Sequence, residues 1–387
     1  MPTLHDIRTP ALVLERPKVE RNVSQMAERM RRHGVTLRPH LKTAKCPQVA
    51  SLATAGQSGG ITVSTLAEAA YFAGHGFRDI TYAVGITPSK LEAVAALQRQ
   101  GALLRILTED LDVARAIGVR AASLGATFHV LVEIDTGGGR GGLEPESSAL
   151  VEVARLLHDS PGVELDGVLT HAGHSYACDR IEDVRTVAEQ ERQGIVLAAA
   201  RLRDAGIPCP VVSAGSTPTA VHAESLAGVT EMRPGNYMFF DLSQVGLGSC
   251  AVEDVAVTVL ASVIGHAGSN RRPLLDAGSL ALSNDTGANR RLPGVGFGIV
   301  CDLHGLPLGG VVPTPGARFT GARVSRVNQE HGFLGSDFPI PARDLPVGSR
   351  VRILPNHACI TAAMFDAYHV VEGGMEVVGL WPRVRGW

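Results

Sequence analysis

The sequence predicts an α/β protein: a (β/α)8 barrel of the TIM type followed by a C-terminal all-β domain. Eight apolar, β-rich runs alternate with segments of helical periodicity over the first two thirds of the chain. The runs are continuously apolar, which is typical of parallel strands that helices cover. After about residue 245 the pattern changes to strand-like runs between loops rich in Gly, Pro, Asn and Asp, with no good helix between them.

The barrel interpretation depends on the order of these elements. Strands are expected at 35–38, 60–63, 79–83, 103–107, 128–134, 165–169, 210–212 and 229–232. Helices are expected at 19–33, 46–55, 65–74, 88–100, 111–124, 147–159 and 181–205, with a short, weak one at 217–226. Eight such units match a barrel of roughly 250 residues. A doubly wound open sheet is the rival, but Pro39-His40-Leu41-Lys42 follows the first strand instead of a glycine fingerprint.

The second domain is expected to hold strands at 255–264, 272–276, 318–327, 350–354 and 374–381. A further strand-like segment at 11–15 precedes the barrel and could belong to either part. We therefore predict a barrel over residues 12–245 and a β domain over residues 246–387. The β domain is expected to include residues 1–11 as well and to carry the candidate metal pair.

Composition excludes several classes of protein. The 387 residues carry 36 Lys+Arg against 38 Asp+Glu, and 45% are hydrophobic, so a large core is expected and global disorder is not. The net charge of -2 argues against a nucleic-acid or anionic-membrane partner. No signal peptide and no membrane-spanning apolar run are found, and six dispersed cysteines without a CxxC pair favour a reduced, cytoplasmic protein.

The end of the seventh predicted strand suggests a phosphate site. Gly215, Ser216 and Thr217 combine a glycine bend with two hydroxyls at a helix start. Backbone N–H groups and the helix dipole at such a place suit a phosphate, and barrels often bind phosphate at the loops after strands seven and eight. The alternative is an ordinary helix N-cap, which Ser and Thr favour.

Lys42 follows the first barrel strand and is expected to point into the barrel mouth. Poor solvation there would lower its pKa and make the amine a usable nucleophile. The alternative is a rim lysine with its head in water. A phosphate site, a barrel-mouth lysine and an arginine together favour pyridoxal 5'-phosphate (PLP) over a plain sugar phosphate.

His357 and Cys359 form a candidate metal pair in the β domain. At i and i+2 on a strand they would point to the same side, and imidazole and thiolate are both good zinc ligands. Two protein ligands suit an open site with positions left for substrate. The alternative is a satisfied core histidine beside a buried cysteine.

Four motifs together resemble one family. They are R-P-H-L-K-T at 38–43, T-H-A-G-H-S-Y at 170–176, G-S-T-P-T at 215–219 and P-N-H-A-C at 355–359. The chain resembles the alanine-racemase-like, fold type III PLP enzymes over essentially its whole length. Within them it is most similar to the zinc-dependent D-serine dehydratase and D-threo-3-hydroxyaspartate dehydratase branch, with D-threonine aldolase as a close relative.

The resemblance implies roles for individual residues. Lys42 would hold PLP covalently, His171 would stack on the pyridine face, and Arg140 would lie near the PLP phenolate. Gly215, Ser216 and Thr217 would hold the phosphate, with Tyr237 in reach. Arg233 would face the pyridine nitrogen, and Tyr176 would line the cofactor site. The metal, Zn²⁺ or another divalent ion, would be bound by His357 and Cys359. Alternatives stay open: Arg233 could pair with Glu231 or Asp241, and Tyr176 could be plain cavity wall.

The resemblance also implies an activity. A D-β-hydroxy amino acid such as D-serine or 3-hydroxy-D-aspartate would lose water, and hydrolysis of the product would give a 2-keto acid and ammonia, with Lys42 as base and the metal assisting the leaving hydroxyl. The rival is a retro-aldol cleavage to glycine and an aldehyde; aldolases of the family tend to carry a carboxylate in place of the cysteine, so Cys359 favours the dehydratase. A non-catalytic PLP-binding barrel and a cofactor-free barrel lyase are further alternatives, and the resemblance implies a homodimer.

Overall fold

The computed structural model describes residues 2–57, 60–269 and 271–387. The chain divides into two compact units. One, the barrel unit, comprises Gln25–Gly235 together with Gly386–Trp387. The other, the β unit, comprises the chain before Gln25 together with Asn236–Arg385.

The barrel unit is built on an 8-stranded sheet in which every pairing is parallel. Its order is β2 (Thr36–Leu37), β9 (Glu231–Met232), β8 (Val211–Ala214), β7 (Val163–Thr170), β6 (Phe128–Ile134), β5 (Leu103–Thr108), β4 (Asp79–Gly85) and β3 (Ile61–Val63). A parallel bridge between His40 and Thr62 joins the two ends of this order, with Leu41 N donating to Thr62 O at 2.8 Å. The sheet therefore closes on itself, and the predicted (β/α)8 barrel is confirmed.

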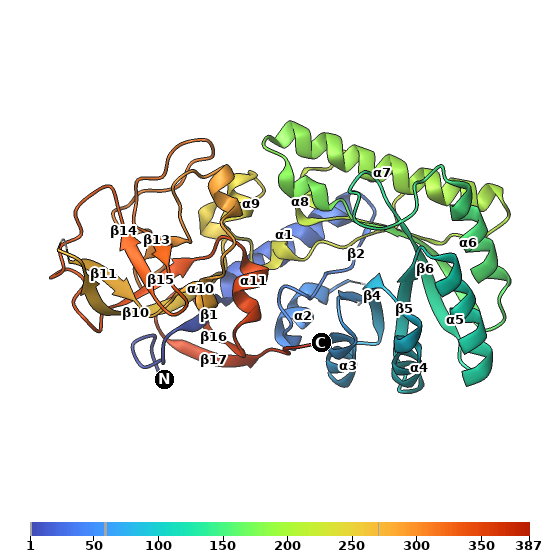
Figure 1. Ribbon diagram of the computed structural model, residues 1–387, viewed down its shortest axis with the longest axis horizontal. Coiled ribbons are helices and arrows are strands. Elements are labelled where there is room, and N and C mark those ends of the chain that lie inside the picture. The colour runs from blue at the N-terminus through green and yellow to red at the C-terminus, as the bar shows by residue number, and fades with distance from the viewer. Residues whose placement is uncertain (1, 58–59, 270) are drawn as a thin grey trace. The chain divides into compact units, whose positions relative to one another are not determined.

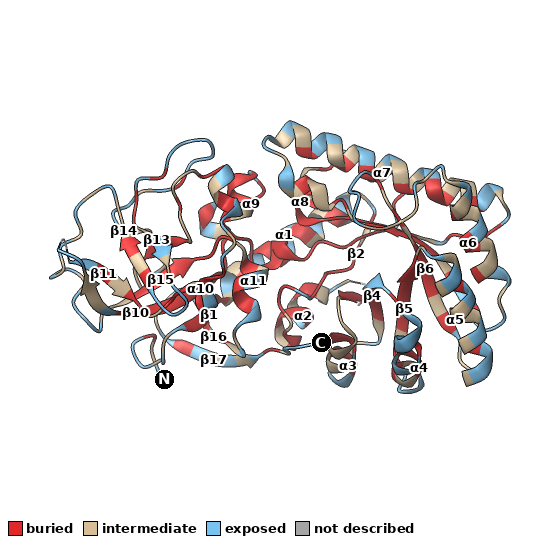
Figure 2. Ribbon diagram, viewed as in Figure 1, coloured by how far each residue is buried: buried red, intermediate tan, exposed pale blue. Residues whose placement is uncertain are grey.

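Helices connect successive strands. They are α1 (Arg16–Arg32), α2 (Pro47–Thr54), α3 (Leu66–Gly74), α4 (Leu91–Arg99) with the turn η1 (Pro88–Lys90) before it, α5 (Leu111–Leu124), α6 (Ser148–Asp159), α7 (Ile181–Asp204) and α8 (Thr217–His222). Local sequence sets their ends: the Asp110 side chain accepts from Val113 N at the start of α5, and Gly125 at φ +56 ends it. In Figure 1, α4, α5 and α6 lie along one face of β4–β6. Figure 2 shows those strands largely buried and the outward faces of the helices exposed.

The β unit holds a 9-stranded sheet among its described residues. The order is β11 (Arg272–Leu275), β14 (Gly332–Gly335), β13 (Arg323–Val327), β12 (Ile299–Cys301), β15 (Arg350–Leu354), β10 (Val257–Ala267), β1 (Ala11–Glu15), β16 (Ala367–Val371) and β17 (Val377–Pro382). Because β11 also pairs with β10, the strands from β11 to β10 in this order form a closed ring. The predicted C-terminal β domain is therefore present.

The position of β1 differs from the predicted domain boundary. β1 pairs antiparallel with β10 and parallel with β16, so Ala11–Glu15 belongs to the β sheet and not to the barrel. Every residue of β1 is buried, and its backbone is paired on both edges. A boundary at residue 12 therefore cuts through a strand, whereas the division between compact units falls after Ser24, within α1.

The prediction of no helix in the β domain was wrong. Short helices occur at α9 (Leu242–Gly246), α10 (Ser279–Leu282) and α11 (Ala358–Ala363). None is longer than two turns, so none produces a recognisable helical period in the sequence. The strands β12, β14 and β16 were also not predicted.

No helix in the described part of the chain combines the length and the apolar character that a bilayer crossing requires.

Candidate active site

The carboxyl ends of the barrel strands bring together most of the residues predicted to bind PLP. Lys42 follows β2, Arg140 follows β6, His171 and Tyr176 follow β7, and the loop from Gly215 to Thr217 follows β8. Arg233 follows β9 directly. In barrel enzymes this end of the strands carries the chemistry, because the βα loops converge there.

Lys42 lies in a turn after β2 and its side chain is exposed. The prediction of a poorly solvated amine does not hold in this structure, because the turn carries the residue beyond the buried strand. Its backbone N–H donates to His40 Nδ1 at 3.4 Å. His40 itself is buried, and burial together with the charges of Lys42 and Arg233 holds its pKa well below the ordinary value. A neutral imidazole and an exposed amine therefore lie side by side at this strand end.

His171 is tied to the loop after β8. Its Nδ1 lies 2.9 Å from Gly215 O. Burial and the positive charge of Lys42 lower the pKa of His171 to about 3, so the ring is neutral at physiological pH. A neutral ring whose Nδ1–H donates to a carbonyl leaves Nε2 as an acceptor.

The loop after β8 is held by protein groups. Gly215 adopts φ +115, and Ser216 is the N-cap of α8 and forms a reciprocal capping box with Thr219. Gly215 N donates to Glu191 Oε1 at 3.0 Å, and Ser216 N donates to Thr219 Oγ1 at 3.0 Å. Two of the amides predicted to bind phosphate are thus already paired, so the N-cap alternative is confirmed, and phosphate binding by this loop stays a prediction.

Glu191 was not predicted from the sequence. It lies on α7, is buried, and its Oε1 accepts from both Ala172 N (2.8 Å) and Gly215 N. Burial raises the pKa of Glu191, and these two donors oppose the rise. One carboxylate thus joins the loops that follow β7 and β8. A glutamate within an amphipathic helix pattern gives no sequence signal for such a role.

Arg233 is buried in the barrel unit, with an exposed fraction of 4%. Its Nη1 donates to Ser213 Oγ at 2.6 Å and its Nη2 to Thr170 O at 2.5 Å. Nε is buried and has no hydrogen-bond partner among the described residues. Burial lowers the pKa of Arg233 to about 10, against the opposing effect of Glu231 and Glu191, so the group stays cationic.

The proposed alternative pairing of Arg233 with Glu231 is indirect. Glu231 Oε1 accepts from Ser213 Oγ at 2.5 Å, while its Oε2 lies 2.7 Å from Arg38 Nε. The buried, unpaired donor of Arg233 is therefore available to an acceptor such as the pyridine nitrogen of PLP.

Arg140 and Tyr176 lie in loops. Arg140 is exposed at the end of a glycine run that the Asp135 side chain organises by accepting from Gly137, Gly138 and Gly139 backbone N–H groups. Tyr176 is half-buried in the turn η2 (Gly173–Ala177). Their predicted roles toward PLP stay predictions.

Tyr237 belongs to the β unit by the division of the chain. It is buried in the turn η3 (Asn236–Met238), and burial raises its pKa. Its predicted reach to the phosphate stays a prediction.

His357 and Cys359 do lie together, but for a different reason from the one predicted. β15 ends at Leu354, His357 is the N-cap of α11, and Cys359 lies in the first turn of that helix. The prediction that strand alternation aligns them was wrong, because the chain leaves the strand at Pro355-Asn356. Their side chains still interact, and the pair is half-buried.

Acidic and amide side chains surround this pair. His357 Nδ1 lies 2.7 Å from Asp285 Oδ2, and Asn236 Nδ2 lies 4.0 Å from Cys359 Sγ. Burial disfavours the imidazolium, but Asp285 and Cys359 outweigh it and raise the pKa of His357 to about 11. A carboxylate on one ring nitrogen is the usual partner of a metal-binding histidine. Imidazole and thiol are donors that fit a divalent metal such as zinc, and the carboxylate would orient the imidazole.

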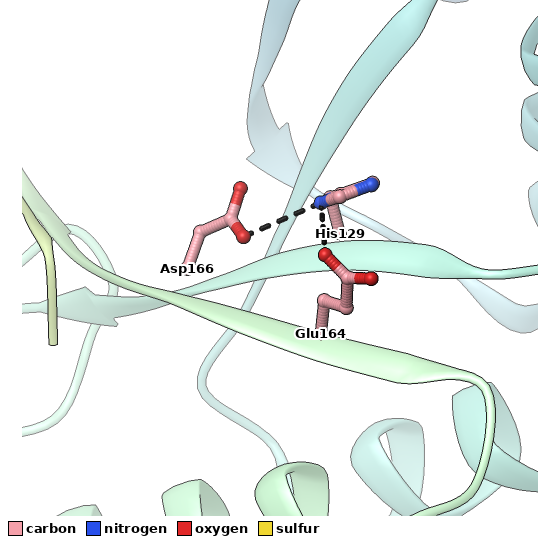
Figure 3. Close-up of side chains that lie close together, drawn as sticks. All are labelled: His129, Glu164 and Asp166. Carbon is pink, nitrogen blue, oxygen red and sulfur yellow. Dashed lines mark hydrogen bonds and ion pairs between the residues drawn. The ribbon is translucent and has the colours of Figure 1, made fainter. Parts of the chain in front are cut away.

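A different cluster also combines potential metal ligands. His129, Glu164 and Asp166 offer ligand atoms within 4.8 Å of one another at the amino-terminal ends of β6 and β7 (Figure 3). Asp166 already binds Arg105, at 2.7 Å, and the hydrogen bond that Asp166 accepts from His129 raises the pKa of His129. Cationic side chains thus neutralise the carboxylates, and we interpret the cluster as an ion-pair network.

A parallel barrel with basic and imidazole side chains at its strand ends, joined in sequence to a β unit with a His–Cys pair, defines a two-domain barrel enzyme. Comparison with known proteins identifies the family. The model of the alanine racemase N-terminal domain matches residues 15–243, and that of a putative serine dehydratase domain matches residues 256–371.

Individual relatives match over the full length. The chain is 45% identical to a D-threo-3-hydroxyaspartate dehydratase of Delftia sp. (strain HT23), covering 100% of this chain and 99% of the relative. It is 31% identical to a D-serine dehydratase of Dictyostelium discoideum (99% and 98%) and 29% identical to a D-threonine aldolase of Arthrobacter sp (97% and 92%). A solved structure of a D-threo-3-hydroxyaspartate dehydratase mutant in the metal-free form has a TM-score of 0.93, 44% identity and 100% coverage of both chains.

The chain therefore belongs to the alanine-racemase-like family of fold type III PLP enzymes, in the branch of the D-serine and D-threo-3-hydroxyaspartate dehydratases.

Proposed function

We propose that the protein is a PLP- and zinc-dependent lyase that converts a D-β-hydroxy amino acid to a 2-keto acid and ammonia. D-Serine would give pyruvate, and 3-hydroxy-D-aspartate would give oxaloacetate. Water leaves from the α and β carbons and is regained when ammonia is released, so each reaction balances as substrate to keto acid plus ammonia. The observation that carries the proposal is the 45% identity to a D-threo-3-hydroxyaspartate dehydratase along the whole of both chains.

The residues of the barrel unit fit PLP. Lys42 offers an exposed amine at a strand end, and Arg233 Nε is a buried donor in need of an acceptor. His171 presents a neutral ring, whose flat face suits stacking on an aromatic cofactor. The remaining cofactor contacts would come from Arg140, Tyr176, the loop from Gly215 to Thr217, and Tyr237.

His357 and Cys359 would hold the metal, with Asp285 fixing the orientation of the imidazole. Two protein ligands leave positions for substrate. When bound, PLP supplies a ring that withdraws electrons from the α carbon, and the metal supplies a Lewis acid for the departing β-hydroxyl.

The chain's own groups move the protons. The Lys42 amine would hold the cofactor and, once released by the substrate amine, take the α-proton. Arg233 is cationic and donates, so the ring nitrogen facing it would stay largely unprotonated. PLP would then withdraw electrons from the α carbon less strongly, and the metal held by His357 and Cys359 would supply the help that the departing hydroxyl needs.

A substrate screen tests the proposal. The full-length protein, loaded with PLP and zinc, is incubated with the D and L forms of serine, threonine and 3-hydroxyaspartate, and keto acid, ammonia, glycine and aldehyde are measured. We expect keto acid and ammonia in equal amounts from a D substrate only. We also expect at least about a 1000-fold loss of turnover in Lys42→Ala, because both the cofactor link and the base are removed.

Control variants separate the alternatives. Lys45→Ala alters a lysine of the same turn that pairs with Glu68 at 3.1 Å, and it should retain activity. Glycine and aldehyde as main products would show an aldolase instead. Equal activity in Lys42→Ala and the unaltered chain would point to a cofactor-free lyase, and PLP binding without turnover of any substrate would point to a non-catalytic carrier.

A homodimer in the cytoplasm completes the proposal. The family resemblance supports the dimer, and six dispersed cysteines without a CxxC motif support a reducing compartment. Sedimentation equilibrium of the loaded protein would give the oligomeric state directly.

A further inference from the structure

A network of charged side chains runs through the interior of the barrel behind Arg233. Glu231 pairs with Arg38 at 2.7 Å, and Arg38 pairs with Asp79 through two hydrogen bonds of 2.9 Å. Arg105 bridges Asp79 to Asp166. Two of these pairs, Arg38–Asp79 and Arg105–Asp166, join strands that are not neighbours in the sheet. Inward side chains of alternate strands meet in layers inside a closed barrel, so we place these contacts within the ring.

The hydroxyl of Ser213 links this network to Arg233, and the direction of its two hydrogen bonds is fixed. Its hydroxyl has a single proton, which it donates to Glu231 Oε1 at 2.5 Å. Its lone pairs therefore face Arg233, and they accept from Nη1 at 2.6 Å. Ser213 and Glu231 are both buried, so no bulk water competes for these bonds.

Two fixed points determine the orientation of the guanidinium. Nη1 is held by Ser213, and Nη2 is held by Thr170 O at 2.5 Å. Because the group is planar, two bonds from different nitrogens set both its plane and its rotation. Nε is the guanidinium nitrogen without a hydrogen-bond partner in the described chain, and its N–H then has a fixed direction.

We propose that Ser213 and Glu231 are positioning residues that aim Arg233 at the ring nitrogen of the cofactor, with Arg38 anchoring Glu231 from the barrel interior. This inference rests on the proposed function, because it assumes that PLP occupies the barrel mouth. Neither residue touches the reacting atoms; each acts through Arg233. The negative charge of Glu231 also favours the cationic form of the buried guanidinium.

Comparison of two cofactors isolates this role. One is PLP, and the other is 1-deaza-PLP, in which a C–H group replaces the ring nitrogen while phosphate and aldehyde are kept. Dissociation constants of the full-length apoprotein are measured for both, and the ratio reports the contact with the ring nitrogen. Loss of general packing weakens both cofactors alike and leaves the ratio unchanged.

Ser213→Ala removes the bond to Nη1, and Glu231→Gln removes the charge behind it. We expect each variant to lower the preference for PLP over the deaza analogue by about three- to tenfold, the range of a weakened hydrogen bond from a charged donor. Two variants are needed because either may reduce the yield of folded protein. The matched control is Asp166→Asn, which breaks the same network at its far end, where Arg105 and not Arg233 is the partner.

The outcomes are distinct. A reduced ratio in Ser213→Ala or Glu231→Gln, with an unchanged ratio in Asp166→Asn, supports the inference. Equal weakening of both cofactors in these variants, or an unaltered chain that binds both equally, overturns it while the proposed function stands. An unaltered chain that binds neither cofactor overturns the proposed function and the inference with it.

Discussion

Glu191 shows how a single buried side chain can organise several parts of a candidate site. Its Oε1 accepts from Ala172 N at 2.8 Å and from Gly215 N at 3.0 Å, one in the loop after β7 and one in the loop after the neighbouring strand β8. His171 precedes the first of these donors and Ser216 follows the second. The carboxylate therefore sets the spacing between the predicted stacking histidine and the predicted phosphate loop.

Glu191→Ala is expected to destabilise the protein and to weaken PLP binding. The substitution leaves two buried amide N–H groups without an acceptor, and each costs about 1–3 kcal/mol. Thermal unfolding of the apoprotein measures the first effect, and the PLP dissociation constant measures the second.

Glu189→Ala is the matched control for this change. Glu189 lies on the same helix, its side chain is 43% exposed, and it pairs with Arg192 at 2.5 Å, so its loss should alter stability by no more than about 1 kcal/mol. If the two variants behaved alike, Glu191 would have no special role in holding the loops.

A site residue can be predicted from the sequence when it directly follows a recognisable strand. It cannot be predicted when its role depends on hydrogen-bond partners that are distant in the sequence. Lys42 and Arg233 each follow a strand closely, so the barrel pattern alone points to them. Glu191 bonds to a residue 19 positions away, and Asp285 to one 72 positions away. No local pattern connects such pairs, and only the folded backbone brings them together.

The junction of β15 and α11 determines how the predicted metal pair is presented. A strand would have pointed both side chains to one side by alternation. Instead, His357 is in an extended conformation, with φ -141, as the N-cap, and the first helical turn directs Cys359 back toward it. Leu242 N and Ser243 N of α9 donate to Pro355 O and Asn356 O, at 3.1 and 3.2 Å, so a neighbouring helix holds this turn in place.

Asp285→Asn is expected to weaken zinc binding by about 10- to 100-fold, because the histidine would lose the carboxylate that fixes its ring and increases its basicity. Competition with a chromophoric chelator measures zinc affinity directly, without reference to turnover. Asp366→Asn serves as the control, because Asp366 is an exposed carboxylate of the same unit that pairs with Arg385 at 2.5 Å. Equal zinc affinity in both variants would remove Asp285 from the metal site.

Several elements with a clear period were predicted at their observed bounds, and several short ones in the β unit were not predicted. α5 occupies the predicted residues, and β6 and β15 do as well, because each has enough residues to show its repeat. β12 has 3 residues and α10 has 4, too few for any period to appear. The strand at Ala11–Glu15 was recognised as a strand, but its sheet could not be assigned, since pairing partners lie hundreds of residues away.

The two units differ in what fills their interiors. The interior of the barrel combines an apolar layer of Leu107, Leu131 and Leu169 with the charged network behind Arg233. The β unit buries a cluster that includes Leu4, Val13 and Leu260. Because the barrel unit contains paired charged side chains, its free energy of unfolding depends on their protonation state. His129 is suited to a test of this dependence, because it pairs with Asp166 and its pKa is raised.

His129 should stabilise the protein at acidic pH and contribute less as the pH rises. Its hydrogen bond with Asp166, then the charges of Asp166 and Glu164, raise its folded-state pKa, while burial and Arg105 oppose the rise. A raised folded pKa means that the stabilisation is fully present below the unfolded value of about 6.5 and is lost as the pH passes through the folded value. We therefore expect His129→Gln to lower the free energy of unfolding by about 1 kcal/mol or less at about pH 5.5, and by a smaller amount at about pH 9.

Urea unfolding of both proteins at the two pH values measures this difference, and other titrating groups cancel because they are common to both. The prediction would be contradicted if the loss of unfolding free energy in His129→Gln grew toward alkaline pH. The imidazole would then be neutral in the folded state, and Arg105 alone would pair with the carboxylates.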